Sequence, residues 1–105
     1  MYDNTCVYSI ALEESVEEEL AAIRPFEGRR ILEAIREQLS HDPAVESRRR
    51  KVLRGVQPPF KAVRPLWELR VGEYRVFYDV NAEQRKVYVR AVRGKPPHRT
   101  TEDIL

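Results

Sequence analysis

The sequence has few of the residues on which several common classes of protein depend. Its single cysteine, Cys6, cannot form an intramolecular disulfide, the usual cross-link of small secreted domains. No apolar run approaches the roughly 18 residues that a membrane-spanning helix needs. The first residues also lack the basic start and apolar stretch of a signal peptide. We therefore expect a cytoplasmic protein without disulfides and without a membrane partner.

Motifs for metals, phosphate loops and protein nucleophiles are also missing. The one cysteine and the two histidines, His41 and His98, do not have the spacing of zinc ligands. The four glycines are isolated from one another, which excludes a glycine-rich phosphate loop. No serine or cysteine stands in a nucleophile signature. The sequence therefore predicts a protein that uses neither a metal nor a cofactor.

The chain's 105 residues leave room for one domain, which we expect to span residues 1–105. Its 42% hydrophobic and 34% charged residues are typical of a globular protein rather than a disordered one. Residues 1–47 contain 4 Lys or Arg and 11 Asp or Glu, a net charge of −7, whereas residues 48–105 contain 15 and 6, a net charge of +9. This division indicates a basic surface for a polyanion, although chance segregation of charge between helices and strands would give the same counts.

The apolar residues of the first half predict a strand followed by two helices. Residues 7–11 form a short apolar-rich strand. A first helix is expected to begin after Ser15 as its N-cap and to end at Pro25. A second helix is expected over residues 27–39, where apolar residues recur at helical spacing. The stripe of this second helix consists of Ile31, Ile35 and Leu39.

The second half changes to a period of two. Residues 44–65 are basic, contain prolines and have no clear period, so they predict a long loop. Three alternating segments then predict antiparallel strands over residues 66–71, 74–80 and 86–91. The expected fold is α+β, in the order β-α-α-β-β-β. In it, a helix hairpin packs on one face of a mainly antiparallel sheet, and the other face is open to solvent.

The open face of this sheet is the candidate site. The alternation places Glu68 and Arg70 on one side of their strand, with Arg75 on the same side of the next. Guanidinium groups bind phosphate oxygens through a two-pronged fork, and the nearby aromatic side chains of Phe60, Phe77 and Tyr88 are suited to stack on bases. A plainer interpretation is that Arg70 and Arg75 form exposed ion pairs and that Phe77 completes a second, smaller apolar patch.

Basic residues before, within and after this sheet extend the candidate surface. They are expected to contact RNA through its phosphates, or to form a solvated flank without a partner. The candidate RNA-binding residues are Arg48, Arg49, Arg50, Lys51, Arg54, Lys61, Arg90 and Arg93.

Two segments carry a resemblance to a known family. LWELRVGEYRVFYDV, over residues 66–80, and VYVRAVRGK, over residues 87–95, resemble the sheet core of the RelE/ParE superfamily of toxins. The helix hairpin and the KVLRG stretch, residues 51–55, fit the same pattern. The resemblance implies the toxin of a type II toxin-antitoxin module, held inactive by a cognate antitoxin. RelE-like members cut mRNA on the ribosome, whereas ParE-like members inhibit DNA gyrase.

The resemblance also implies roles for particular residues. In the RNA-cleaving branch, the arginine of the Tyr-Arg pair stabilises phosphate, and that residue here is Arg75. A basic residue just after the last strand acts similarly, with Lys95 or Arg93 as candidates, and Arg70 matches a further basic position. The chain departs from RelE at Leu66 and Glu68, where RelE has lysines, and it lacks the C-terminal tyrosine. His98 is the candidate substitute for the missing proton shuttle.

These implications give three hypotheses. The first is a ribosome-dependent mRNA endonuclease in which the ribose 2′-hydroxyl attacks the phosphate without a metal. The second is a non-enzymatic inhibitor of DNA gyrase, which the incomplete acid–base set favours. The third is a degenerate member that retains only antitoxin binding.

Overall fold

The helices and strands follow the predicted order, with one additional strand and a short C-terminal helix. The computed structural model describes residues 7–105, so Cys6 lies outside the described residues. Within the described range, one sheet contains five strands in the order β1-β5-β4-β3-β2. The elements are β1 (Ser9–Leu12), α1 (Glu14–Ala21), α2 (Pro25–Leu39), β2 (Arg50–Leu53), β3 (Leu66–Val71), β4 (Tyr74–Asn81), β5 (Lys86–Gly94) and α3 (Thr101–Ile104).

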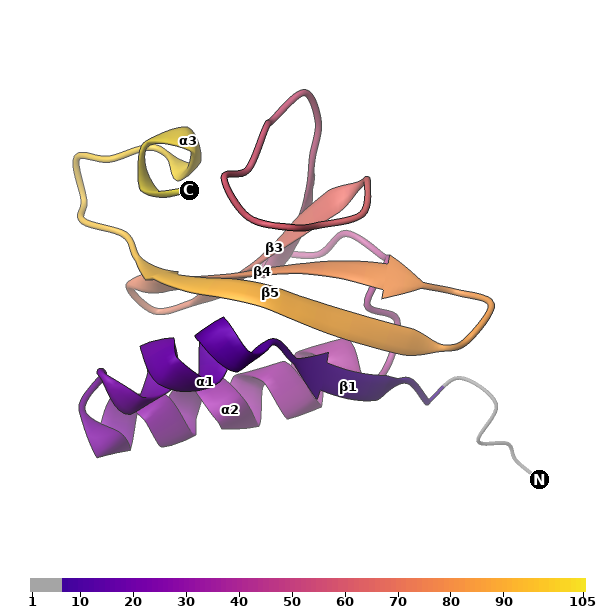
Figure 1. Cartoon of the computed structure of the whole chain (residues 1–105), viewed down its shortest axis with the longest axis horizontal. Coiled ribbons are helices and arrows are strands. Elements are labelled where there is room, and N and C mark those ends of the chain that lie inside the picture. Colours follow the sequence, from indigo (N-terminus) through magenta and orange to yellow (C-terminus); the bar gives the residue numbers. More distant parts are fainter. Residues whose placement is uncertain (1–6) are drawn as a thin grey trace.

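The sheet is mainly antiparallel, as predicted. β1 pairs with β5 in parallel, and the other neighbouring strands pair in antiparallel fashion. Helices α1 and α2 lie side by side over one face of this sheet (Figure 1). The α+β fold with a helix hairpin on one face is therefore confirmed.

The start of α1 differs from the prediction, because the chain continues as an extension of β1 for one residue more. Glu13 donates its backbone N–H to the carbonyl oxygen of Val89 on β5, at 3.1 Å. Glu13 therefore occupies the N-cap position, and Ser15 lies within the first turn without a capping role. Glu14 and Glu17 occupy this first turn, where carboxylates interact favourably with the helix dipole.

Helix α2 begins two residues earlier than predicted. Pro25 is its first residue, where the missing N–H of proline costs nothing because that position has no intrahelical acceptor. Pro25 therefore starts α2, while α1 already ends at Ala21. The predicted stripe of Ile31, Ile35 and Leu39 is buried against the sheet.

The main core lies between the two helices and the sheet, and Tyr78 on β4 is at its centre. The Tyr78 ring is fully buried and stacks on Trp67 of β3, with the ring centroids 6.1 Å apart. Its hydroxyl donates a hydrogen bond of 2.7 Å to the carbonyl oxygen of Pro43. A buried hydroxyl needs such a partner, so this bond fixes the segment after α2 to the core.

Burial raises the pKa of Tyr78 well above its ordinary value of 10.0. Tyr78 therefore stays protonated in the folded chain at a pH where it would ionise in the unfolded chain, so unfolding above about pH 10 releases a proton. We expect the free energy of unfolding to fall as pH rises above about 10. Tyr78→Phe should remove this part of the dependence and cost about 1 kcal/mol at pH 7 through the lost hydrogen bond. Urea unfolding of both proteins between pH 7 and 11 measures the effect; parallel curves would contradict it.

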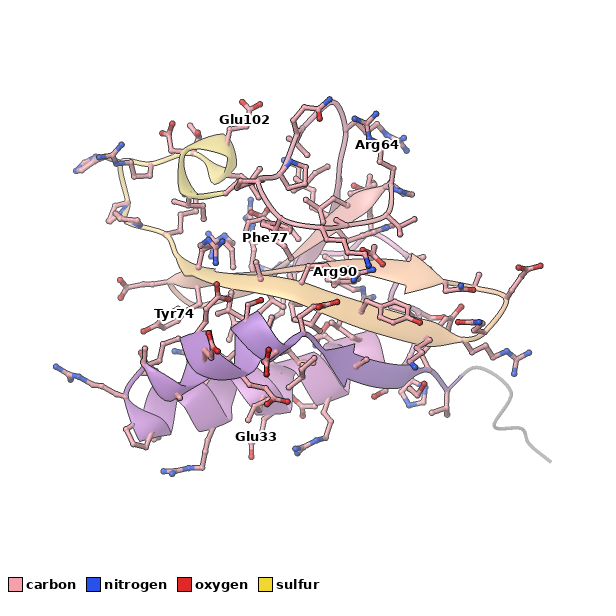
Figure 2. All side chains as sticks on the ribbon, in the orientation of Figure 1. Glu33, Arg64, Tyr74, Phe77, Arg90 and Glu102 are labelled. Carbon is pink, nitrogen blue, oxygen red and sulfur yellow. The ribbon has the colours of Figure 1, made fainter. Side chains whose placement is uncertain are left out.

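The second face of the sheet is covered, so the prediction of an open face was wrong. The loop between β2 and β3 and the C-terminal α3 lie over this face, opposite the helix hairpin (Figure 1). Phe77 of β4 points into the space beneath them (Figure 2). A second apolar cluster fills this space, and its members are Leu53, Val56, Phe60, Ala62, Leu66, Phe77, Ala91, Ile104 and Leu105.

Strand β2 lies inside the segment that was predicted to be a loop. Its alternation is hidden in the sequence because Arg50 occupies a position on the helix side of the sheet. The Arg50 guanidinium is bound there by the side-chain oxygen and backbone carbonyl of Gln38 and by the carbonyl of Val45. β2 is an edge strand, and basic side chains on an edge discourage pairing with other chains.

A β-bulge interrupts the pairing of β4 and β5. Phe77 pairs with Ala91 and Tyr78 pairs with Val89, so Arg90 is the extra residue between them. The bulge breaks the simple alternation of β5, so Ala91 lies in the second cluster and not on the helix side. Val92 faces the helices instead.

Candidate nucleic-acid interface

Four arginines form a row across the sheet at the end that carries the β3–β4 turn. Arg70 pairs with Arg75 across β3 and β4, and Arg75 pairs with Arg93 across β4 and β5. Arg49 extends the row, because its carbonyl accepts the backbone N–H of Arg70 at 2.8 Å. With strands about 4.8 Å apart, this arginine row spans about 14 Å. Like charges directly opposite one another destabilise a sheet, so the row concentrates positive charge at this end of the molecule at some cost in stability.

Arg75 is held in one orientation in the middle of this row. Its Nη1 donates to the carbonyl oxygens of Gly72 and Tyr74, at 2.9 and 2.8 Å. Its side chain is 12% exposed, and its Nε lies 3.8 Å from Oε2 of Glu68. Burial lowers the pKa of Arg75, and the charge of Glu68 partly offsets this effect. Within residues 7–105, its buried Nε has no hydrogen-bond partner, and the two carbonyls bound by Nη1 hold the guanidinium in place.

Glu68 connects this site to the C-terminal segment. The side chain is 1% exposed, and its Oε2 accepts a hydrogen bond of 2.6 Å from the Thr101 hydroxyl. Thr101 is the first residue of α3, which Thr100 and Asp103 close with a reciprocal capping box. α3 is thereby fixed over the second face, beside the arginine row.

Arg90 is bound internally and is not presented to solvent. Its Nε and Nη2 donate to the carboxylate of Asp79 at 2.7 and 3.2 Å, and its Nη1 donates to Glu13 at 2.6 Å. The hydrogen bond to Asp79 raises the pKa of Arg90, and the residue is 7% exposed. Asp79 also accepts the backbone N–H of Val63 in the β2–β3 loop, at 2.9 Å. This geometry assigns Arg90 a structural role in joining α1, the sheet and the loop.

Arg93 also has internal partners, but unlike Arg90 its side chain is only half-buried. It forms an ion pair with Glu19 of α1, and its guanidinium lies 5.7 Å from the centre of the Phe60 ring. The same Glu19 carboxylate accepts the backbone N–H of Val92 at 2.8 Å. Arg93 therefore contributes charge to one end of the arginine row while it fixes α1 to the sheet edge.

The other candidate residues divide by exposure. Lys95 is half-buried at the end of β5, where its backbone N–H donates to the Glu73 carbonyl at 2.7 Å. His98 is exposed in the following turn, and within residues 7–105 no hydrogen bond or ion pair joins it to Arg75. The exposed basic candidates are Arg48, Arg49, Lys51, Arg54, Lys61 and Arg70.

Arg30 on α2 is a residue that the sequence analysis missed. It lines a cavity of about 440 Å³ together with Arg48, Arg49, Arg70 and the β3–β4 turn. On the sequence it is one of several exposed helix residues, and nothing in the helical period marks it. Across residues 7–105, no group of three or more His, Cys, Asp or Glu side chains is placed to hold a metal ion.

A family comparison identifies the chain. The family described as "ParE toxin of type II toxin-antitoxin system, parDE" matches residues 10–95. The chain belongs to this toxin family. The match covers both helices of the hairpin and the whole sheet apart from the first residue of β1, so the ParE-family assignment rests on the same elements that carry the arginine row.

Solved structures place this ParE-family toxin close to RelE. The toxin is similar to a chain of the archaeal RelE-RelB complex from Pyrococcus horikoshii OT3, at 25% identity over 90% of this chain and 99% of that chain, with a TM-score of 0.66. It is similar to the isolated E. coli RelE toxin at 26% identity over 90% and 88%, with a TM-score of 0.58. The fold also matches the toxin-antitoxin complex RelBE2 from Mycobacterium tuberculosis at 18% identity over 90% and 98%, with a TM-score of 0.63. No curated protein sequence matches.

These findings confirm the resemblance to the RelE/ParE superfamily and the RelE-like fold. The ParE-family toxin therefore carries, on a RelE-like sheet, a row of arginines beside a buried carboxylate.

Proposed function

We propose that this toxin is an mRNA endonuclease that acts on the ribosome and inhibits translation. The observation that supports this function is the arginine row with Arg75 fixed at its centre by two backbone carbonyls. Guanidinium groups that are held in place before the substrate binds stabilise developing negative charge without reorganisation. The similarity to RelE structures at 25% and 26% identity adds support.

Cleavage in this mechanism uses the RNA's own nucleophile. The ribose 2′-oxygen forms a bond to the adjacent phosphorus, and the bond from phosphorus to the 5′-oxygen of the next nucleotide breaks. The 2′-hydroxyl proton passes to a base, and an acid protonates the leaving 5′-oxygen. Arg75, with Arg70 opposite it on β3 and Lys95 just after β5, stabilises the charge that develops on the phosphorane oxygens.

His98 is the proposed proton carrier in these two transfers. An imidazole group can both accept and donate a proton, and histidine is the side chain used most often as a general acid or base. His98 lies in an exposed turn, and the mechanism requires this turn to approach the bound RNA. We expect His98→Ala to slow cleavage by about 10²-fold, the loss of one general acid–base group, as measured by the rate of mRNA cleavage on purified ribosomes. His98→Ala with an unchanged rate would remove this residue from the mechanism.

The exposed basic residues just before β2, on β2 and in the following loop are proposed to dock the toxin on RNA. Arg48, Arg49, Lys51, Arg54 and Lys61 are all exposed, and their charges can neutralise phosphates. Binding through phosphates is strongly weakened by salt, so the affinity of the toxin for ribosomes should fall steeply between 50 and about 200 mM salt.

A cognate antitoxin is the proposed protein partner. The similar toxins from Pyrococcus horikoshii OT3 and Mycobacterium tuberculosis were solved as toxin-antitoxin complexes. Among residues 7–105, no helix is long and apolar enough to cross a membrane. The proposed targets, ribosome and mRNA, place the toxin in the cytoplasm.

Mapping of mRNA 5′ ends after brief induction in a bacterium tests the proposed function. We expect new ends inside coding regions, in register with codons, and none after induction of Arg75→Ala. Growth arrest without new ends would overturn the endonuclease assignment.

The alternative function, inhibition of DNA gyrase without catalysis, is favoured by one observation. Glu68 places a buried carboxylate 3.8 Å from Arg75, where it offsets the positive charge available to a phosphate. A supercoiling assay with purified toxin and gyrase distinguishes the two functions. A toxin that affects neither RNA nor supercoiling but binds its antitoxin would be the degenerate member.

A further inference from the structure

A cavity of about 440 Å³ lies where α2 meets the β3–β4 turn. Arginines from three parts of the chain line it: Arg30 from α2, Arg48 and Arg49 from the segment before β2, and Arg70 from β3. Val71 and Gly72 complete the lining, which contains no carboxylate. Such a concentration of guanidinium groups around one concavity produces a strongly positive potential.

The structure holds Arg30 against the β3–β4 turn. A Cβ atom on Gly72 would lie 2.7 Å from Nη2 of Arg30, so the absence of a side chain permits this close approach. Gly72 has φ +57°, a conformation that glycine adopts without strain. Arg30 therefore packs against the backbone of the turn at Gly72. The carbonyl oxygen of the same Gly72 accepts a hydrogen bond from Arg75.

The positive charge of this cavity is largely uncompensated. Glu27 lies 3.5 Å from Arg30, but both side chains are substantially exposed, and such pairs are weak. Within residues 7–105, Arg48, Arg49 and Arg70 form no ion pair. Arginines that repel one another without compensating carboxylates point to an anionic ligand.

We propose that this cavity is a second phosphate-binding site, which holds a backbone phosphate of the RNA away from the bond that is cut. The inference rests on the proposed function for the identity of the RNA. Its lining has four guanidinium donors but no histidine, carboxylate or tyrosine, so it can bind a phosphate but has no group to move a proton. Arg70 belongs both to this cavity and to the arginine row, which makes the two sites continuous.

A single RNA strand fits this arrangement better than an isolated anion. The cavity volume is that of a nucleotide-sized site, larger than one phosphate group requires. The arginine row continues from Arg70 in the cavity lining to Arg75 on the neighbouring strand, one strand spacing of about 4.8 Å away. A strand bound at both places would be positioned by one phosphate while another is presented to Arg75.

RNA binding by the full chain, measured without ribosomes, tests this site. A fluorescent single-stranded RNA is titrated with wild type, Arg30→Ala, Arg30→Lys and Arg29→Ala, and its anisotropy is followed over a range of salt concentrations. Arg29 is the matched control because it is an exposed arginine of the same helix that lines a different, apolar groove.

Arg30→Ala is expected to weaken RNA binding about tenfold, the loss of roughly one charge-assisted contact. The slope of log affinity against log salt should fall by about 0.7, the value for one phosphate of a single strand. Arg30→Lys should be intermediate because it keeps the charge but loses the fork. Arg29→Ala should change binding less than twofold. Equal effects of Arg29→Ala and Arg30→Ala would overturn the site.

Two further measurements distinguish a phosphate site for RNA from a loss of folding and from a preference for duplex DNA. Thermal unfolding should be the same for Arg30→Ala and wild type, because the Arg30 side chain is 50% exposed. Titration with duplex DNA of equal length shows whether the ligand is RNA: a loss of affinity confined to the duplex would overturn the RNA assignment. The titration measures RNA binding and not cleavage, so its outcome is independent of the 5′-end mapping. If Arg30→Ala weakens RNA binding but induction of the wild-type toxin in cells produces no new mRNA 5′ ends, the phosphate site is supported and the endonuclease function is rejected.

Discussion

Replacing Arg75 by alanine is expected to slow mRNA cleavage on the ribosome by about 10²–10³-fold, the typical effect of removing one preorganised donor. The expected size of this loss in rate follows from the way in which the Arg75 side chain is held. Two backbone carbonyls fix its Nη1, so the guanidinium does not have to be ordered when the charge on the phosphate develops. Single-turnover cleavage of a defined mRNA on purified ribosomes measures the rate directly.

Matched variants separate the fork of Arg75 from its charge. Arg75→Lys should recover part of the rate, because a lysine supplies the charge but not the planar pair of donors. Arg36→Ala, an exposed arginine on α2, should cleave at the wild-type rate. Cleavage by Arg75→Ala within threefold of wild type, with unchanged thermal unfolding, would show that Arg75 takes no part in the chemistry.

Arg90→Ala is expected to cause the largest loss of stability of any basic residue in the chain, about 3–5 kcal/mol. The Asp79 carboxylate is 2% exposed and receives both Nε and Nη2 of Arg90. Removing Arg90 leaves this buried charge with the Val63 N–H as its remaining partner, and it also frees Glu13. Urea unfolding followed by far-UV circular dichroism measures the change.

The double variant Asp79→Leu/Arg90→Met tests the cause of this loss. Replacing both members of a buried ion pair by apolar residues removes the uncompensated charge, so the double variant should lose less stability than the sum of the two single changes. Arg36→Ala serves as the control and should lie within about 0.5 kcal/mol of wild type. If the loss of unfolding free energy in the double variant equals the sum of the losses in the two single variants, the Asp79–Arg90 contact is not the cause of the destabilisation.

The sequence predicts well those parts of the fold in which local period and burial agree. The stripe of Ile31, Ile35 and Leu39 is a repeated helical pattern, and its members do pack on the sheet. The alternation of β3 and β4 likewise fixes which residues share a face, so the pairing of Arg70 with Arg75 follows from it. Both depend on neighbours within a few residues of one another.

The parts that could not be predicted depend on contacts between distant segments. The cover over the second face requires the β2–β3 loop and the C-terminal residues to meet over Phe77. Nothing in the local period of Val56, Phe60 or Ile104 indicates that meeting. Strand β2 was missed because Arg50, on the helix side, finds its partners on α2 and the segment after it.

The candidate site was predictable in composition but not in the partners of each residue. The sequence places Arg90 among the basic residues of the last strand, and its apparent role there is nucleic-acid contact. Its partners, Asp79 and Glu13, are 11 and 77 positions away, so its burial follows from tertiary structure. The same limitation applies to Arg30, whose importance depends on a turn that is formed by two strands of the sheet.

The parallel pairing of β1 with β5 determines when this chain can fold during its synthesis. Ser9 pairs with Lys86, so the first strand waits for a partner that is translated 77 residues later. At about 5–20 residues per second, that interval is about 4–15 s. During this time β1 has no strand to pair with, and α1 has no β5 to pack against. Arg93 belongs to the same late strand. The sheet that carries the arginine row is therefore complete only after the whole of β5, through Arg93, has been translated.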